Sequence, residues 1–224
     1  MIPKNMKYIS IFLLCFSFIF LNSCGIENYI YLTPVTAITK TADTISVTLP
    51  LLSDQPVDYF SGYMIYYKIY TSTNNLTSII ESSNFNEINS TMSTDFSKMS
   101  PYVSTDSFNS INMYVFLNSI GFSQLQLENT DIISLLKTIN NFKIQKNQIE
   151  LDLEYSSNSY PLIRINKETF KYKSDISGDD VVVIDNHSTA YAMFIIFAYG
   201  VDEYGSPIFS RPSLLGVLQL PQPQ

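Results

Sequence analysis

Two separated segments of the chain are apolar on both faces of an extended strand, and they constrain the fold most. Residues 62–70 and 191–199 carry apolar side chains at nearly every position, whereas a half-solvated strand alternates apolar with polar residues. A strand with two apolar faces is typical of the middle of a sheet that is covered on both sides. We therefore predict that residues 62–70 and 194–199 form neighbouring central strands, far apart in the sequence and paired in space.

The rest of the chain carries the alternating patterns of further strands. Residues 44–50 place Ile45, Val47 and Leu49 on one face, and residues 148–155 alternate strictly. Residues 71–110 are rich in Ser, Thr and Asn and predict a long excursion with room for one short helix. Further strands are predicted at residues 111–118, 162–165, 169–173, 181–184 and 214–220. One good helix is predicted over residues 131–139, with Thr130 or Asp131 as its N-cap and Ile132, Leu135, Leu136 and Ile139 on one face.

The N-terminus has the pattern of an export signal. Lys4 and Lys7 precede the apolar run ISIFLLCFSFIFL at residues 9–21, which is shorter than the roughly 20 residues of a membrane-spanning helix. The run ends in LNSC at residues 21–24, which resembles the lipobox of bacterial lipoproteins. Asn22 stands where that family commonly has a small or β-branched residue. The alternative is an ordinary signal peptide, or an uncleaved anchor, with a chance cysteine.

The lipobox resemblance implies how the chain is processed and where it resides. Cys24 would carry a diacylglycerol and usually a further acyl chain such as palmitate, after removal of residues 1–23. Residues 24–33 would form a lipidated tether, and residues 34–224 the globular domain. The resemblance implies a lipid anchor in the cell membrane or outer membrane, with the domain periplasmic or surface-exposed.

The composition of the processed chain excludes several classes of protein. Loss of Lys4 and Lys7 leaves 11 basic and 20 acidic side chains, a net charge of −9, which disfavours nucleic-acid binding. Cys15 would be lost with the signal and Cys24 consumed by lipid, so no disulfide is expected. A chain of this length buries enough apolar surface to fold without cross-links. We therefore predict a monomer that folds without metal, disulfide or cofactor.

Two pieces of the chain resemble fibronectin type III domains. ISVTL (residues 45–49) and SGYMIYYK (61–68) are similar to the B and C strands of that family. FIIFAYGVDEYGS (194–206), SRPS (210–213) and VLQL (217–220) are similar to its F strand, the following turn and its G strand. The resemblance implies an Ig-like antiparallel β-sandwich, with an insertion at about residues 72–180 that carries one short helix. The chain lacks the family's usual Trp and has Phe194 at the position of its corner tyrosine.

Metal and histidine chemistry receive little support from the sequence. DISGDD at residues 175–180 makes Asp175, Asp179 and Asp180 weak candidates for a calcium site, because calcium prefers clustered oxygen ligands. The alternative is a polar turn with Gly178 at positive φ. His187 is the only histidine, so zinc lacks a ligand set, and a solvated turn is the alternative to a catalytic role.

Two further groups of side chains are candidates for a functional face. Glu150, Asp152 and Glu154 share one strand face, which indicates either paired acid–base chemistry or, more simply, a solvated surface. Seven tyrosines crowd the two apolar regions, where they either pack in the core or form a binding face. These tyrosines are Tyr63, Tyr66, Tyr67, Tyr70, Tyr191, Tyr199 and Tyr204.

The sequence thus favours a lipid-anchored cell-envelope protein with a non-catalytic binding or scaffolding domain. Its ligand would be a protein or a carbohydrate. The alternative is a hydrolytic enzyme of unrecognised type, with its site in the inserted middle segment.

Overall fold

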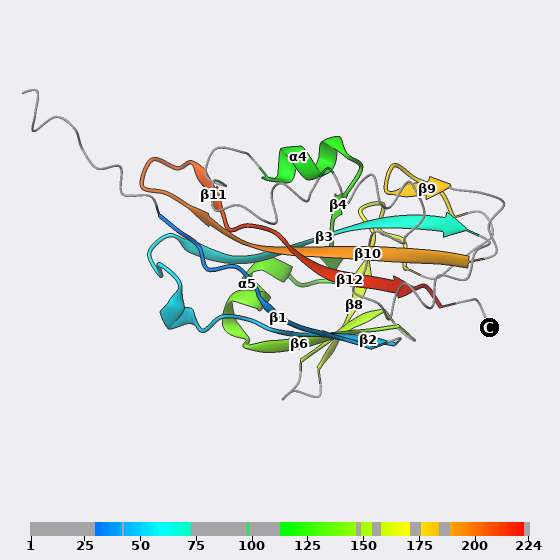
Figure 1. Cartoon of the computed structure of the whole chain (residues 1–224), viewed down its shortest axis with the longest axis horizontal. Helices are drawn as coiled ribbons and strands as arrows, with labels where there is room; N and C mark the ends of the chain where they lie inside the picture. Colours follow the sequence, from blue (N-terminus) through cyan, green and yellow to red (C-terminus); the bar gives the residue numbers. More distant parts are fainter. Residues whose placement is uncertain are drawn as a thin grey trace, which may run out of the picture.

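The protein is a mainly β structure built from two facing sheets (Figure 1). The computed structural model describes residues 30–41, 43–72, 98, 113–146, 149–153, 158–170, 176–183 and 189–221. The predicted signal, Cys24, Glu154, Asp175 and His187 lie outside the described residues. Within the described part of the chain, no helix combines the length and the hydropathy that crossing a bilayer requires.

The first sheet has six strands, and every neighbouring pair in it is antiparallel. Its order is β1 (Ala37–Lys40), β2 (Thr44–Thr48), β6 (Asn141–Gln145), β7 (Glu150–Leu153), β8 (Ser159–Ile163) and β5 (Gln126–Leu127). Ile45 and Val47 of β2 lie opposite Ile144 and Phe142 of β6, and all four are buried. The alternating sequence of these strands therefore gives one core face and one solvated face.

The second sheet is centred on two long strands, β3 (Phe60–Ser72) and β10 (Thr189–Val201). They pair antiparallel along almost their whole length, with Ile65 opposite Ile196. The prediction that these segments are neighbouring central strands is confirmed. β4 (Ser123–Gln124) and β9 (Val181–Val183) pair with the free edge of β3, β9 in parallel orientation. β11 (Pro207–Phe209) and β12 (Ser213–Gln219) pair with the other edge of β10.

Both faces of this central pair are buried, each under a different cover. Ile65, Tyr67 and Phe194 point into the core between the two sheets. Tyr66 and Phe197 belong to a second core on the opposite face, where their rings stack with centroids 5.6 Å apart. The second core is closed by the helix α4 (Met113–Ser119), which Figure 1 shows on the side away from the first sheet.

The helix α4 corrects two predictions. Residues 111–118 are predicted to form a strand, and one short helix is predicted within residues 72–180, where the described residues contain both α4 and α5 (Ile132–Thr138). The aromatic and β-branched residues of α4 favour a strand locally, and a short apolar run does not separate the two structures by periodicity. The buried positions are Met113 and Leu117, four residues apart as on one face of a helix. The tertiary requirement to cover β3 and β10 decides the outcome.

The predicted helix at residues 131–139 is confirmed as α5 (Ile132–Thr138). Asp131 caps it, accepting hydrogen bonds from the backbone N–H groups of Ile133 and Ser134. The Ser134 hydroxyl also donates to this carboxylate and, with those amides, holds the pKa of Asp131 below its usual range. α5 packs closely on β3 at Gly62, where φ is +147° and a Cβ would collide with the Ile133 carbonyl.

Candidate functional site

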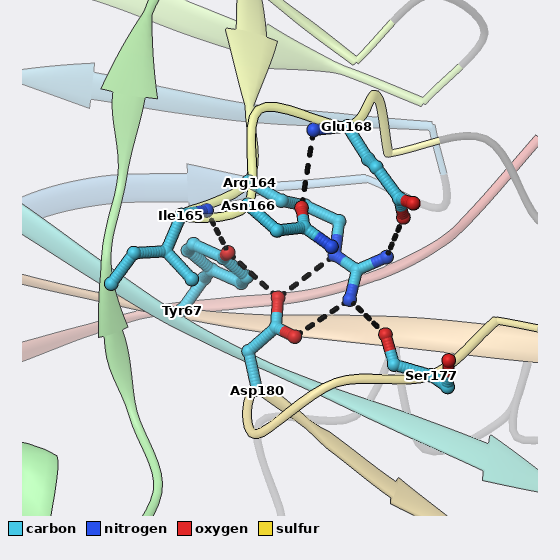
Figure 2. Close-up of polar contacts among 7 residues, drawn as sticks. All are labelled: Tyr67, Arg164, Ile165, Asn166, Glu168, Ser177 and Asp180. Carbon is cyan, nitrogen blue, oxygen red and sulfur yellow. Dashed lines mark hydrogen bonds and ion pairs between the residues drawn. The ribbon is translucent and has the colours of Figure 1, made fainter.

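A buried polar cluster joins β3 to two loops, one at residues 164–168 and one at residues 177–180 (Figure 2). Arg164 follows β8, Asp180 precedes β9, and Tyr67 lies in β3. Each side chain is almost fully buried, with Arg164 and Asp180 both 1% exposed. The fold thus places a complete ion pair inside the protein.

Every polar group of the pair has a partner. Asp180 accepts hydrogen bonds from Arg164 Nε at 2.8 Å, Arg164 Nη2 at 2.6 Å and the Tyr67 hydroxyl at 2.7 Å. Arg164 also donates to the Ser177 carbonyl at 2.6 Å and to the carboxylate of Glu168 at 2.9 Å. The Tyr67 oxygen accepts from a backbone N–H in turn. Such a satisfied network fixes the loops onto β3.

The electrostatics of this cluster favour the charged pair. Burial alone would raise the pKa of Asp180, but the hydrogen bonds from Arg164 and Tyr67 and the charge of Arg164 hold it below its usual value. Burial acts to lower the pKa of Arg164, and its bonds to Asp180 more than offset that effect. Burial and the bond to Asp180 raise the pKa of Tyr67. The cluster contains no activated nucleophile and acts as a structural clamp.

This clamp bears directly on the calcium hypothesis. Both carboxylate oxygens of Asp180 are engaged by Arg164 and Tyr67, so this side chain is a poor cation ligand. Asp179 is exposed, and Asp175 lies outside the described residues. The described residues contain no group of three or more side chains arranged to hold a metal ion. Asp180 is therefore a salt-bridge partner, a role that the sequence analysis did not assign to it.

The acidic strand face lies on β7, beside the neighbouring strands. The Glu150 carboxylate accepts a hydrogen bond from the Ser159 hydroxyl, and Asp152 accepts one from the Gln145 amide. Leu151, between them, is buried in the core. Both carboxylates thus face away from the core on one strand, as in a solvated surface.

The tyrosines divide clearly between core and surface. Five are buried, namely Tyr63, Tyr66, Tyr67, Tyr70 and Tyr191. Burial raises the pKa of both Tyr63 and Tyr66 to about 12, as expected for neutral core side chains. Tyr199 is half-buried, and only Tyr204, in the turn between β10 and β11, is strongly exposed at 84%. These tyrosines serve mainly for packing.

An open groove of about 690 Å³ lies on the surface of the described part of the chain. It lies where β1 and β6 begin and β2 ends. The exposed ring of Tyr31, the Leu51 side chain and two prolines supply apolar surface, and Arg211, Asn140, Asn141 and Asp54 supply polar groups. Apolar walls with a few polar groups are typical of ligand sites.

The state of Arg211 distinguishes this groove from the clamp. No hydrogen bond or ion pair joins its guanidinium to any other group in the described part of the chain, although the residue is half-buried. The guanidinium therefore has five N–H donors free for a ligand. This site could not be predicted from the sequence, because its residues come from four separated segments and carry no motif.

Comparisons with protein-family models, curated proteins and solved structures found no match to this chain. The fold itself defines the class, a two-sheet, mainly antiparallel β-sandwich with a helix over its outer face.

Proposed function

We propose that this protein is a lipid-anchored envelope lipoprotein whose fibronectin type III-like domain binds a ligand in the groove around Arg211. The observation that carries the binding role is the unpaired guanidinium of the half-buried Arg211, which lines the same groove as the exposed ring of Tyr31. Arginine pairs well with carboxylates and other oxygen acceptors, and tyrosine offers contact area at low entropic cost. An acidic peptide or a carbohydrate that bears a carboxylate supplies both contacts.

The strand arrangement supports the fibronectin type III-like part of the proposal. β1 and β2 pair in one sheet, as the A and B strands of the family do, and β6 takes the place of E. β3, β10 and β12 lie side by side in the other sheet, as C, F and G do. Residues 72–180 would then supply, besides β6, the additional strands β4, β5, β7 and β8 and the helices α4 and α5.

A binding role is favoured over the hydrolytic alternative by what the described polar residues do. Asp180 is held in an ion pair, and Glu150 and Asp152 lie together on the outer face of β7. General acid–base chemistry needs two such groups in unequal environments around a cleft. The groove instead combines one cation, Arg211, and a single carboxylate, Asp54, with amides and hydroxyls, which suits recognition.

The binding role is tested with the purified protein on arrays of acidic peptides and glycans. Arg211→Met should abolish or strongly weaken any signal, because it removes the donors and keeps the length of the side chain. Lys167→Met, which removes one positive charge from an exposed turn outside the groove, is the matched control. Equal binding by Arg211→Met and the unsubstituted protein would exclude the groove as the site.

The lipid anchor is tested by growing producing cells with a tagged fatty acid. Cys24→Ala should lose the label and accumulate as uncut precursor, whereas Cys15→Ala should label and mature normally. Equal labelling of Cys24→Ala and the unsubstituted chain would refute the lipoprotein assignment.

A further inference from the structure

Exposed apolar side chains gather at one end of the sandwich, which we call the tether end. The described residues include eight strongly exposed large apolar side chains, and five of them belong to this end. They are Tyr31, Leu51, Leu52, Val57 and Tyr204. Single exposed apolar residues need no explanation, but the concentration of five of the eight at one end suggests that this end meets an apolar partner.

Hydrogen bonds hold the parts of the tether end together. Gln55 is buried and binds Thr33 twice, accepting from its N–H at 2.9 Å and donating to its carbonyl at 3.0 Å. The N–H of Val201 donates to the carbonyl of Tyr59 at 2.9 Å. Figure 1 shows the start of the described chain, the loop before β3 and the β10–β11 turn at the same end of the molecule. The apolar side chains are therefore carried on mutually braced segments.

The length of chain before the sandwich determines what this end can meet. Only six residue steps separate Cys24 from Ile30, and an extended chain spans at most about 3.3–3.6 Å per residue. A lipid on Cys24 would thus keep the tether end within roughly 20 Å of the bilayer surface. The 13 residues of β3 carry the opposite end of the sandwich about 40 Å farther along the strand.

The charge at the tether end selects the kind of lipid surface. Asp54, Asp58 and Glu203 are exposed there, while Lys137 and Arg211, which also lie toward this end, are half-buried. Carboxylates are repelled by anionic headgroups, so attraction of basic side chains cannot hold this end on a membrane. Aliphatic side chains and tyrosine rings, by contrast, favour the boundary between headgroups and acyl chains.

We propose that the tether end docks on the bilayer that anchors the chain, with Leu51, Leu52 and Val57 inserted at the headgroup boundary of neutral lipids. This inference depends on the lipid anchor proposed above. The docking surface adjoins the groove around Arg211, because Tyr31 and Leu51 of the tether end also line that groove. A ligand of the groove would then be bound close to the membrane.

The test places a fluorescent probe on the full-length protein reconstituted in phosphatidylcholine vesicles. The chain favours this design, since Cys15 leaves with the signal and Cys24 carries lipid, so an introduced cysteine is the sole free thiol. Leu52→Cys reports on the tether end. Val183→Cys is the matched control. Val183 is also strongly exposed, and it pairs with Thr71 near the end of β3 that lies away from the tether end.

Spin-labelled lipids should quench the probe at position 52 several-fold more than the probe at position 183. Quenching at position 52 should fall when phosphatidylglycerol is added and recover in high salt. Equal quenching at both positions would overturn the docking. The probe at position 52 could instead become shielded from water as the density of protein on the vesicles rises, without quenching by the spin-labelled lipids. That result would assign the surface to a second copy of the chain and would also overturn the docking.

The lipid on Cys24 is verified by mass spectrometry before reconstitution, which separates the two possible failures. Unlipidated mature protein would refute the proposed anchor, and with it the basis of the docking. Lipidated protein with an unquenched probe would refute the docking alone. The double substitution Leu51→Ser with Val57→Ser gives a second measurement, since it should lower quenching at position 52 while leaving the fatty-acid label unchanged.

Discussion

Removal of the Asp180 carboxylate should be among the most destabilising single changes in the described part of the chain. The substitution Asp180→Ala removes three hydrogen bonds, two from Arg164 and one from the Tyr67 hydroxyl. It leaves a guanidinium that is 1% exposed with only the Ser177 carbonyl and Glu168 as partners. Breaking a buried ion pair in this way costs about 3–5 kcal/mol. A melting temperature falls by roughly 2–4 °C per kcal/mol in a domain of this size, so the expected loss is about 6–20 °C.

Urea unfolding, followed by circular dichroism, measures the free energy of unfolding of each variant. Asp179→Ala is the matched control, since Asp179 is the exposed neighbour and its loss should change stability by less than about 0.5 kcal/mol. The double variant Arg164→Met with Asp180→Leu should recover much of the loss, because no unpaired charge stays buried. A cost below about 1 kcal/mol for Asp180→Ala would show that the clamp is not the buried pair described here.

The same substitution series gives a pH signature. The pKa of Asp180 is lowered in the folded protein, while an unfolded aspartate titrates near about 3.9. Its contribution to stability is therefore fully present above the unfolded value and is lost as the pH falls through the folded value. The stability difference between the unsubstituted protein and Asp180→Asn should stay constant from about pH 5 upward and shrink below about pH 4. A difference that grows on acidification would contradict the assigned direction.

Three further substitutions test other parts of the fold. Gly62→Ala should cost at least about 2 kcal/mol in urea unfolding, from backbone strain and collision with α5, whereas Gly205→Ala, in an open turn, should cost clearly less. Asp131→Ala should lower the melting temperature through the loss of about 1 kcal/mol of helix capping, and Asn at the same position should restore most of it. Tyr67→Phe should cost about 1–3 kcal/mol by urea unfolding, because the Ile165 N–H loses its acceptor and the buried Asp180 carboxylate loses one of its three donors.

The two-sheet core could be predicted from the sequence because its signal is local. The apolar faces of β3 and β10 are visible in each segment separately, and their pairing follows from the need to bury four such faces together. The same reasoning failed for α4, where Tyr114, Val115 and Phe116 favour a strand by propensity. The helix exists because one face of the central pair needs a cover, and that requirement belongs to the tertiary structure.

The clamp could not be predicted for a different reason. Arg164 and Asp180 are 16 residues apart, the first within a short predicted strand and the second in a predicted turn, and neither has a motif around it. The sequence placed Asp180 in a turn with calcium ligands because only its neighbours Asp179 and Gly178 are informative locally. Its burial depends on the path of β3, which brings Tyr67 to the same point from a distant segment. The groove around Arg211 was missed because it also exists only in the assembled fold.

The buried Arg164 and the half-buried Arg211 differ in whether folding supplies partners for the guanidinium. Residues 72–180 carry Arg164, whose guanidinium is fully engaged by Asp180, Glu168 and a backbone carbonyl, and they carry α4, which closes the second core. The described part of this range thus uses its polar and apolar groups to complete the domain. Arg211, outside this range, has no side-chain partner in the described part of the chain, and it lies toward the end that bears most of the exposed apolar side chains. The groove around Arg211 is therefore the place where we propose that a ligand binds, at the same end for which we propose docking on the membrane.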